Sequence, residues 1–207
     1  MDNKDFRKHA HELVDWIADY LGNIEDMQVK PGIQPGEISS QLPEKAPQNG
    51  ESFEDIFHDF RKIILPGMTH WQHPRFHAYF PANNSFPSLL GEMLTAAMGA
   101  QCMIWQTSPA AAELEEVVTN WLRDMTGIPP EFYGVIQDTA STATLVSILT
   151  AREKFTNYGI NKSGFPGGNR YRVYSSTEAH SSIEKAAKIA GLGKENVIKI
   201  PVDDKFS

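Results

Sequence analysis

The stretch that most constrains the fold runs from Gly134 to Thr144, where a short apolar run gives way to small hydroxylated residues. Val135 and Ile136 suit a buried strand, and leucine and isoleucine recur after Thr144 at the spacing of a helix face. The stretch therefore predicts a strand, a tight turn and the start of a helix.

The predicted turn, Asp138 to Ser141, falls where the new helix leaves its first backbone N–H groups without partners. Such a helix end carries roughly half a positive charge and attracts anions. Thr139 and Ser141 would add hydroxyl donors on either side of the small Ala140. The spacing is equally typical of an ordinary core helix with Asp138 as its N-cap, so a phosphate-binding turn is one of two hypotheses.

Two more strands are expected downstream, at 171–175 and 197–200. The helix between them should open with a capping box of Ser181 and Glu184 and end at Gly191. Strands that alternate with helices predict parallel pairing, and hence an α/β sheet covered by helices. His180 lies between the second strand and its helix, where such sheets bind ligands, although a lone histidine there often serves a local hydrogen bond.

Four helices are expected before this sheet. The first helix should begin near Phe6 and end at Gly22, and the second should begin at a Ser52 cap and end at Pro66-Gly67. The third should begin at Pro87, and the fourth should begin at Pro109 and end at Gly127. The connector 29–50 is rich in proline and should be extended. The third helix is apolar on all sides and should be buried. The second helix has an apolar stripe of Phe53, Phe57 and Phe60, which we expect another surface to cover.

The segment 69–81 is dense in aromatic rings and contains His70, His73 and His77. A zinc site of these histidines lacks a cysteine or a nearby carboxylate, and Pro74 interrupts any regular face, so we expect no metal. An aromatic plug in the core and a substrate pocket remain as alternatives.

Two other patterns favour structural roles. Glu113, Glu115 and Glu116 fit a solvated helix face, where they would complement the helix dipole, better than a pair of catalytic acids. The glycines between Tyr158 and Arg170 match no nucleotide-binding spacing and indicate a flexible surface connection.

Composition excludes several classes of partner. A formal net charge of −7 argues against nucleic acid and anionic membranes, since both require clustered Lys and Arg. Cys102 is the only cysteine, no apolar run could span a bilayer, and the start of the chain lacks a signal-peptide pattern. We therefore expect a cytoplasmic protein with neither a nucleic-acid nor a membrane partner.

Five blocks in the chain, in the same order and at similar spacing, resemble the pyridoxal-phosphate-dependent group II decarboxylases, most of all the aromatic-L-amino-acid decarboxylases. The blocks are 66–71, 76–81, 105–110, 134–144 and 174–186. The resemblance implies an aspartate aminotransferase-like fold of type I, with 1–85 as an amino-terminal helical arm swapped in a homodimer. Residues 86–207 would then form the first part of the large domain that binds pyridoxal 5'-phosphate (PLP).

The resemblance also assigns roles to residues. Thr139, Ala140 and Ser141 would hold the phosphate, and His180 would stack on the cofactor ring as the catalytic histidine. The residues expected to bind substrate are Trp71, Tyr79, Phe80 and Pro81, with Gln101 and Met103 reaching into the partner's pocket. The family's aromatic-amino-acid enzymes in animals usually have a Thr after Pro81, whereas this chain has 82–85 as Ala-Asn-Asn-Ser, and this departure bears on substrate choice.

The implied reaction is decarboxylation of an aromatic L-amino acid to its amine and CO2. No lysine in the chain has the context of the cofactor-binding lysine, so that lysine and the acid that pairs with the pyridine nitrogen are expected beyond Ser207. The 207 residues alone should be inactive. The alternatives are an aldehyde synthase or a glutamate-type decarboxylase on the same scaffold, or a dimerisation module without catalysis.

Overall fold

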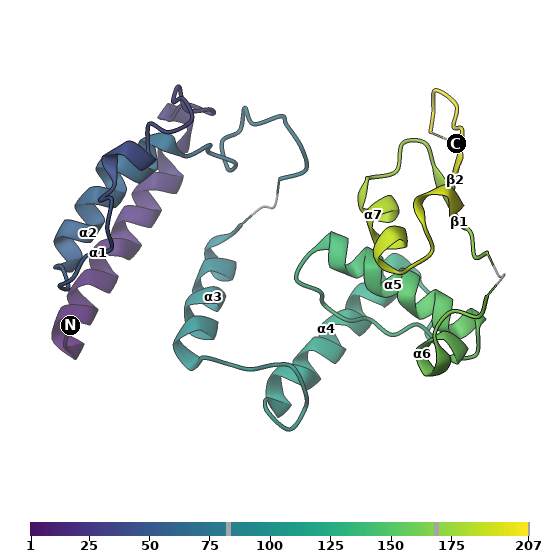
Figure 1. The fold of residues 1–207 in the computed structure, drawn as a ribbon. Helices are drawn as coiled ribbons and strands as arrows, with labels where there is room; N and C mark the ends of the chain where they lie inside the picture. The colour runs from purple at the N-terminus through teal and green to yellow at the C-terminus, as the bar shows by residue number, and fades with distance from the viewer. Residues whose placement is uncertain (82–83, 168–169, 207) are drawn as a thin grey trace. The chain divides into compact units, whose positions relative to one another are not determined.

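The computed structural model describes residues 1–81, 84–167 and 170–206. Its contacts divide the chain into two compact units, Met1–Gly99 and Ala100–Ser207, and each is described by itself (Figure 1). The expected division into an arm and a large domain after residue 85 stays a prediction. Among the described residues, no helix is long and apolar enough to cross a membrane.

Two helices dominate the first half of the first unit. Helix α1 spans Asn3–Gly22, and the Asp2 carboxylate caps it by accepting from the backbone N–H groups of Lys4 and Asp5. Helix α2 spans Phe53–Asp59 and begins, as expected, at a Ser52 cap. It continues through a π-helical turn, Phe60–Ile64, and a 3₁₀ turn, Leu65–Gly67. Short 3₁₀ turns at Ile24–Asp26 and Ser39–Gln41 are the regular elements of the segment between the two helices.

Helix α1 covers the phenylalanine stripe of the second helix. The Trp16 ring meets the Phe57 and Phe60 rings edge-on, with centroids 5.7 and 5.5 Å away. The His9 ring lies 4.8 Å from the Phe53 ring. A helix of the same chain therefore supplies part of the expected covering surface, and the three phenylalanines remain half-buried.

Helix α3, Phe86–Met98, opens with a capping box between Ser85 and Ser88. It was expected to be buried, and this is wrong for the described chain, since Leu94 is 63% exposed and Met98 71%. An apolar helix is buried only where another element packs against it, and no described element of this unit covers α3.

The described residues of the second unit form four α-helices and the sheet. Helix α4, Pro109–Thr126, ends at Gly127, whose φ of 69° is the left-handed conformation that glycine adopts readily. Helices α5, Ala140–Phe155, α6, Gly159–Ser163, and α7, Ser182–Ile189, follow. Strands β1, Val173–Ser176, and β2, Val197–Ile200, pair in parallel with Val173 opposite Val197, as predicted, and a 3₁₀ turn at Lys194–Asn196 precedes β2.

The core of this unit lies between α5, α7 and the strands (Figure 1). Its centre is Ala187, which is fully buried, with Ala190 and Leu192 beside it. The residues packed against that centre are Leu145, Ile148, Leu149, Tyr171, Val173 and Val197. The Arg152 guanidinium donates to the Ala190 carbonyl at 2.7 Å and so joins the carboxyl ends of α5 and α7.

Two local predictions for this unit are wrong. Val135 and Ile136 form no strand and are 62% and 63% exposed, because the described chain provides no strand beside them. Ser181 makes no capping box, since its backbone is helical (φ −58°, ψ −14°) and its side chain caps nothing. Glu184 instead lies 3.7 Å from the Lys188 ammonium and 3.6 Å from that of Lys194.

Candidate functional site

The turn before α5 is built by Thr139. Its backbone is extended (φ −145°, ψ 159°), and its Oγ1 accepts from the Thr142 backbone N–H at 3.2 Å. Thr139 is thus the N-cap of the helix, and the alternative that Asp138 fills this position is wrong. The Asp138 side chain is exposed.

The first amides of α5 remain free to bind a ligand. The backbone N–H groups of Ala140 and Ser141 have no acceptor within the described ranges, and both residues are exposed. Ser141 adds a hydroxyl beside them. Two free amides and a hydroxyl at the positive end of a 16-residue helix form a donor set suited to a phosphate.

His180 lies between β1 and α7, as predicted, and is exposed. Its Nδ1 accepts from the backbone N–H of Ser182 at 3.2 Å and so caps α7. Because Nδ1 is an acceptor in this bond, the neutral ring carries its proton on Nε2. The local hydrogen bond uses Nδ1 and leaves Nε2 and the ring face for the predicted contact with a ligand, which stays a prediction.

The aromatic segment of the first unit brings together some of the predicted substrate residues. The Trp71 ring stacks on the Tyr79 ring, with centroids 5.7 Å apart and planes 16° apart, and lies 4.7 Å from the Phe76 ring. Tyr79 and Phe80 are 87% and 97% exposed, so the alternative of a buried aromatic plug is wrong for them. Pro81 is half-buried, and the departure at Ala82 and Asn83 lies outside the described residues.

Two buried histidines hold this segment. The Tyr20 hydroxyl and His70 Nδ1 are 2.7 Å apart, which joins α1 to the residue before Trp71. Burial, reinforced by nearby His73, lowers the pKa of His70, and burial raises the pKa of Tyr20. The hydroxyl therefore donates to a neutral imidazole.

His73 is held in a similar way. Its Nδ1 accepts from the Arg75 N–H at 2.9 Å, and its Nε2 lies 3.3 Å from the Glu25 carbonyl, to which it donates. Among the described residues no three metal-binding side chains gather. Both histidines instead fix the backbone on either side of Trp71.

Gln101 and Met103 lie in the turn that precedes α4. The Gln101 carbonyl accepts from the Thr107 hydroxyl at 2.7 Å, which shapes the turn, and the Met103 side chain is 75% exposed. Both residues are exposed. Their expected reach into a partner's pocket stays a prediction.

Two glutamates of α4 accept hydrogen bonds from residues outside the helix. Glu113 accepts from the Trp105 indole N–H at 2.9 Å, and Glu115 accepts from the Ile136 backbone N–H at 2.7 Å. Glu113 is exposed, as expected of a solvated face, and Glu115 is half-buried. The expected role as dipole partners is wrong for both, because neither lies in the first turn of the helix and each holds a loop. The spacing of these residues along the chain gives no signal of either contact.

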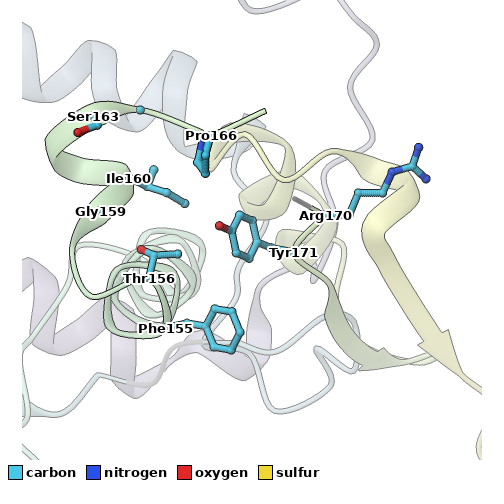
Figure 2. Close-up of a pocket in the computed structure, with 9 residues that line it drawn as sticks. Phe155, Thr156, Gly159, Ile160, Ser163, Pro166, Arg170 and Tyr171 are labelled. Carbon is cyan, nitrogen blue, oxygen red and sulfur yellow. The ribbon is translucent and has the colours of Figure 1, made fainter. Parts of the chain in front are cut away.

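A cavity of about 610 Å³ opens at the other end of α5 (Figure 2). The Tyr171 ring lies between the side chains of Phe155 and Ile160, whereas the Arg170 side chain extends away from them. Helix α6 lines this cavity, so the glycine-bearing segment is partly regular, although Gly168 lies outside the described residues. Since α5 has 16 residues, the cavity lies roughly 24 Å from Thr139 and is not part of the turn before α5.

Comparison with known proteins identifies the family. Residues 35–207 match the pyridoxal-dependent decarboxylase conserved domain. The chain belongs to this family. This membership confirms the α/β fold of the aspartate aminotransferase type that the resemblance implied.

The relatives of this chain are named as decarboxylases of different amino acids. The chain is 46% identical to histidine decarboxylase of Drosophila melanogaster, in a match that covers 91% of this chain and 24% of that relative. It is 42% identical to aromatic-L-amino-acid decarboxylase of Sus scrofa, which it covers to 44%.

Among solved structures, it superposes on Catharanthus roseus tryptophan decarboxylase in complex with L-tryptophan, with a TM-score of 0.89 and 38% identity. That match covers 99% of this chain and 43% of the other. The chain therefore spans less than half the length of these relatives.

Proposed function

We propose that the complete protein is a PLP-dependent decarboxylase that converts an aromatic L-amino acid to its amine and CO2. The observation that carries this proposal is the start of α5, where Thr139 caps the helix and leaves the Ala140 and Ser141 amides free. Because the chain belongs to a pyridoxal-dependent family, the phosphate of PLP is the anion that these donors would bind.

The residues of this chain fit that cofactor. The amides of Ala140 and Ser141, with the Ser141 hydroxyl, would hold the phosphate, and the face of the His180 ring would lie against the pyridine. PLP supplies the electron sink that makes loss of CO2 from an amino acid possible. His180 Nε2 is the atom that can pass a proton at the site, because Nδ1 is engaged by the Ser182 amide.

The aromatic segment supports an aromatic substrate. Trp71 and Tyr79 already stack, which gives a flat apolar surface against which another ring could bind. Arg75 is the only Arg or Lys within 69–81, and its side chain is exposed. The segment therefore offers little to clamp the second carboxylate of an acidic amino acid.

The remaining parts of the site belong to this proposal as well. The lysine that binds PLP covalently and the acid that pairs with its pyridine nitrogen would come from the rest of the complete protein. The enzyme would be a cytoplasmic homodimer in which Gln101 and Met103 approach the partner's substrate pocket.

The test is an assay of the complete protein with PLP and DOPA, tryptophan, tyrosine, histidine and glutamate, in which CO2 and the organic product are both measured. The proposal predicts an amine from one of the aromatic amino acids as the main product. A preference for glutamate would contradict the substrate class. Release of an aldehyde in place of the amine would favour an aldehyde synthase.

A further inference from the structure

The segment that leads into the phosphate turn is anchored to α4. Glu115 Oε1 accepts from the Ile136 backbone N–H at 2.7 Å, across 21 positions of sequence. Glu115 is half-buried, whereas its neighbour Glu116 is exposed. A carboxylate that accepts from an amide at this distance forms one of the stronger hydrogen bonds available to a protein.

A second anchor lies two residues earlier, at Gly134. A Cβ at Gly134 would lie 2.5 Å from the Cβ of Thr119, closer than real atoms approach, so the segment contacts α4 through bare backbone. Thr119 is 9% exposed, and its hydroxyl donates to the Glu115 and Glu116 carbonyls at 2.9 and 3.1 Å. Both anchors thus involve one face of one helical turn, since Glu115 and Thr119 are four residues apart.

These anchors matter because the segment has little else to hold it. The Val135 and Ile136 side chains are 62% and 63% exposed, and in the described part of the chain their backbone joins no sheet. Thr139, Ala140 and Ser141 follow within five residues of Ile136. The contacts with α4 therefore set where the free amides of α5 begin.

Resting on the function proposed above, we infer that Glu115 is a positioning residue for the cofactor phosphate. It touches neither cofactor nor substrate. It acts through the Ile136 amide, which fixes the segment that leads into the phosphate turn, while Gly134 and Thr119 permit the close approach. Loss of the Glu115 carboxylate should loosen the turn and weaken PLP binding.

The experiment measures PLP affinity by absorbance titration of the complete apo-enzyme and three variants. Glu115→Ala should bind PLP roughly ten-fold more weakly, the scale set by one lost hydrogen bond to a charged group. Glu115→Gln keeps an acceptor oxygen and should restore most of the affinity. Glu116→Ala, one position along the same helix, should match wild type. At saturating PLP, kcat of Glu115→Ala should approach the wild-type value.

Hydrogen exchange of the Ile136 amide gives a second readout, which is independent of activity. Exchange in the apo-enzyme should be faster in Glu115→Ala than in wild type and unchanged in Glu116→Ala. Wild-type affinity or wild-type exchange in Glu115→Ala would overturn the inference, as would a Glu115→Gln variant as weak as Glu115→Ala. If the wild-type protein itself binds no PLP, the proposed function fails first, which separates the two failures.

Discussion

At the scale of single residues, the proposed phosphate site depends on Thr139, Ala140 and Ser141. Thr139 uses its hydroxyl oxygen to cap α5, so the two residues after it are the ones whose amides stay free. This division of roles was predictable in outline, because capping residues and small residues are local signals. The identity of the cap was not predictable, since Asp138 and Thr139 are both good N-cap residues and the backbone conformation decides between them.

Replacement of Ser141 by Asp should weaken cofactor binding by at least about ten-fold, because a carboxylate beside the free amides repels the phosphate. Retention of cofactor absorbance after dialysis of the complete protein measures the effect. Thr150→Asp, at an exposed position in the same helix, is the control and should retain the cofactor. Equal retention in Ser141→Asp and wild type would refute the assignment of the phosphate to this turn.

Asp138→Asn should have the opposite effect. Asp138 is an exposed acid next to the cap, and it does not cap the helix itself. Removal of its charge should tighten PLP binding by about two- to five-fold, as for other exposed charge pairs. The gain should shrink as salt is added. Affinity measured at low and high salt tests both points, and weaker binding by the variant would contradict them.

At the scale of elements, the Tyr20–His70 hydrogen bond joins α1 to the aromatic segment. Burial lowers the pKa of His70 below its ordinary value of 6.5, so the folded protein holds it neutral more firmly than the unfolded chain does. The stabilisation is fully present above pH 6.5, and it is lost as pH falls from there through the lowered folded pKa.

We therefore expect His70→Asn to reduce the loss of stability between pH 7.5 and 5.5, compared with wild type. The measurement is the urea midpoint at both pH values, followed by tryptophan fluorescence. His11→Asn, at an exposed position on α1, is the control and should leave the pH dependence intact. An unchanged pH dependence in His70→Asn would show that this histidine does not titrate with folding.

At the same scale, an element can be predicted from the sequence when the interactions that form it are local. The Ser52 cap, the Pro109 start and the Gly127 stop were all predictable, because each depends on residues within one helical turn. Val135 and Ile136 have strand-like side chains, yet a strand also requires a partner distant in sequence. For the same reason the Glu115 anchor of Ile136 could not be seen in the spacing of the glutamates, since 21 positions separate the bonded residues.

At the scale of the whole molecule, the main feature of the described residues is apolar surface that their own unit leaves exposed. Leu94 and Met98 on α3, and Trp121 and Met125 on α4, are between 60% and 74% exposed. The family relatives described above are more than twice as long as the part that this chain matches. These surfaces are therefore candidates for contact with the rest of the protein or with a second copy.

The 207 residues expressed alone should not decarboxylate amino acids and should not remain a compact monomer. Size exclusion with light scattering tests association, and borohydride reduction with PLP tests for a specific pyridoxyl-lysine within this segment. Leu94→Glu should increase the monomer fraction, whereas Glu92→Gln, exposed on the same helix, should not. A well-folded wild-type monomer, or one specific labelled lysine, is the outcome that this view does not allow.

The most direct test of the central claim is a crystal structure of the complete protein with PLP, in which the distances from the phosphate oxygens to the Ala140 and Ser141 amide nitrogens are measured. We predict distances of about 3 Å, typical of hydrogen bonds, with the His180 ring stacked on the pyridine. A phosphate bound elsewhere, with these two amides still free, would contradict it.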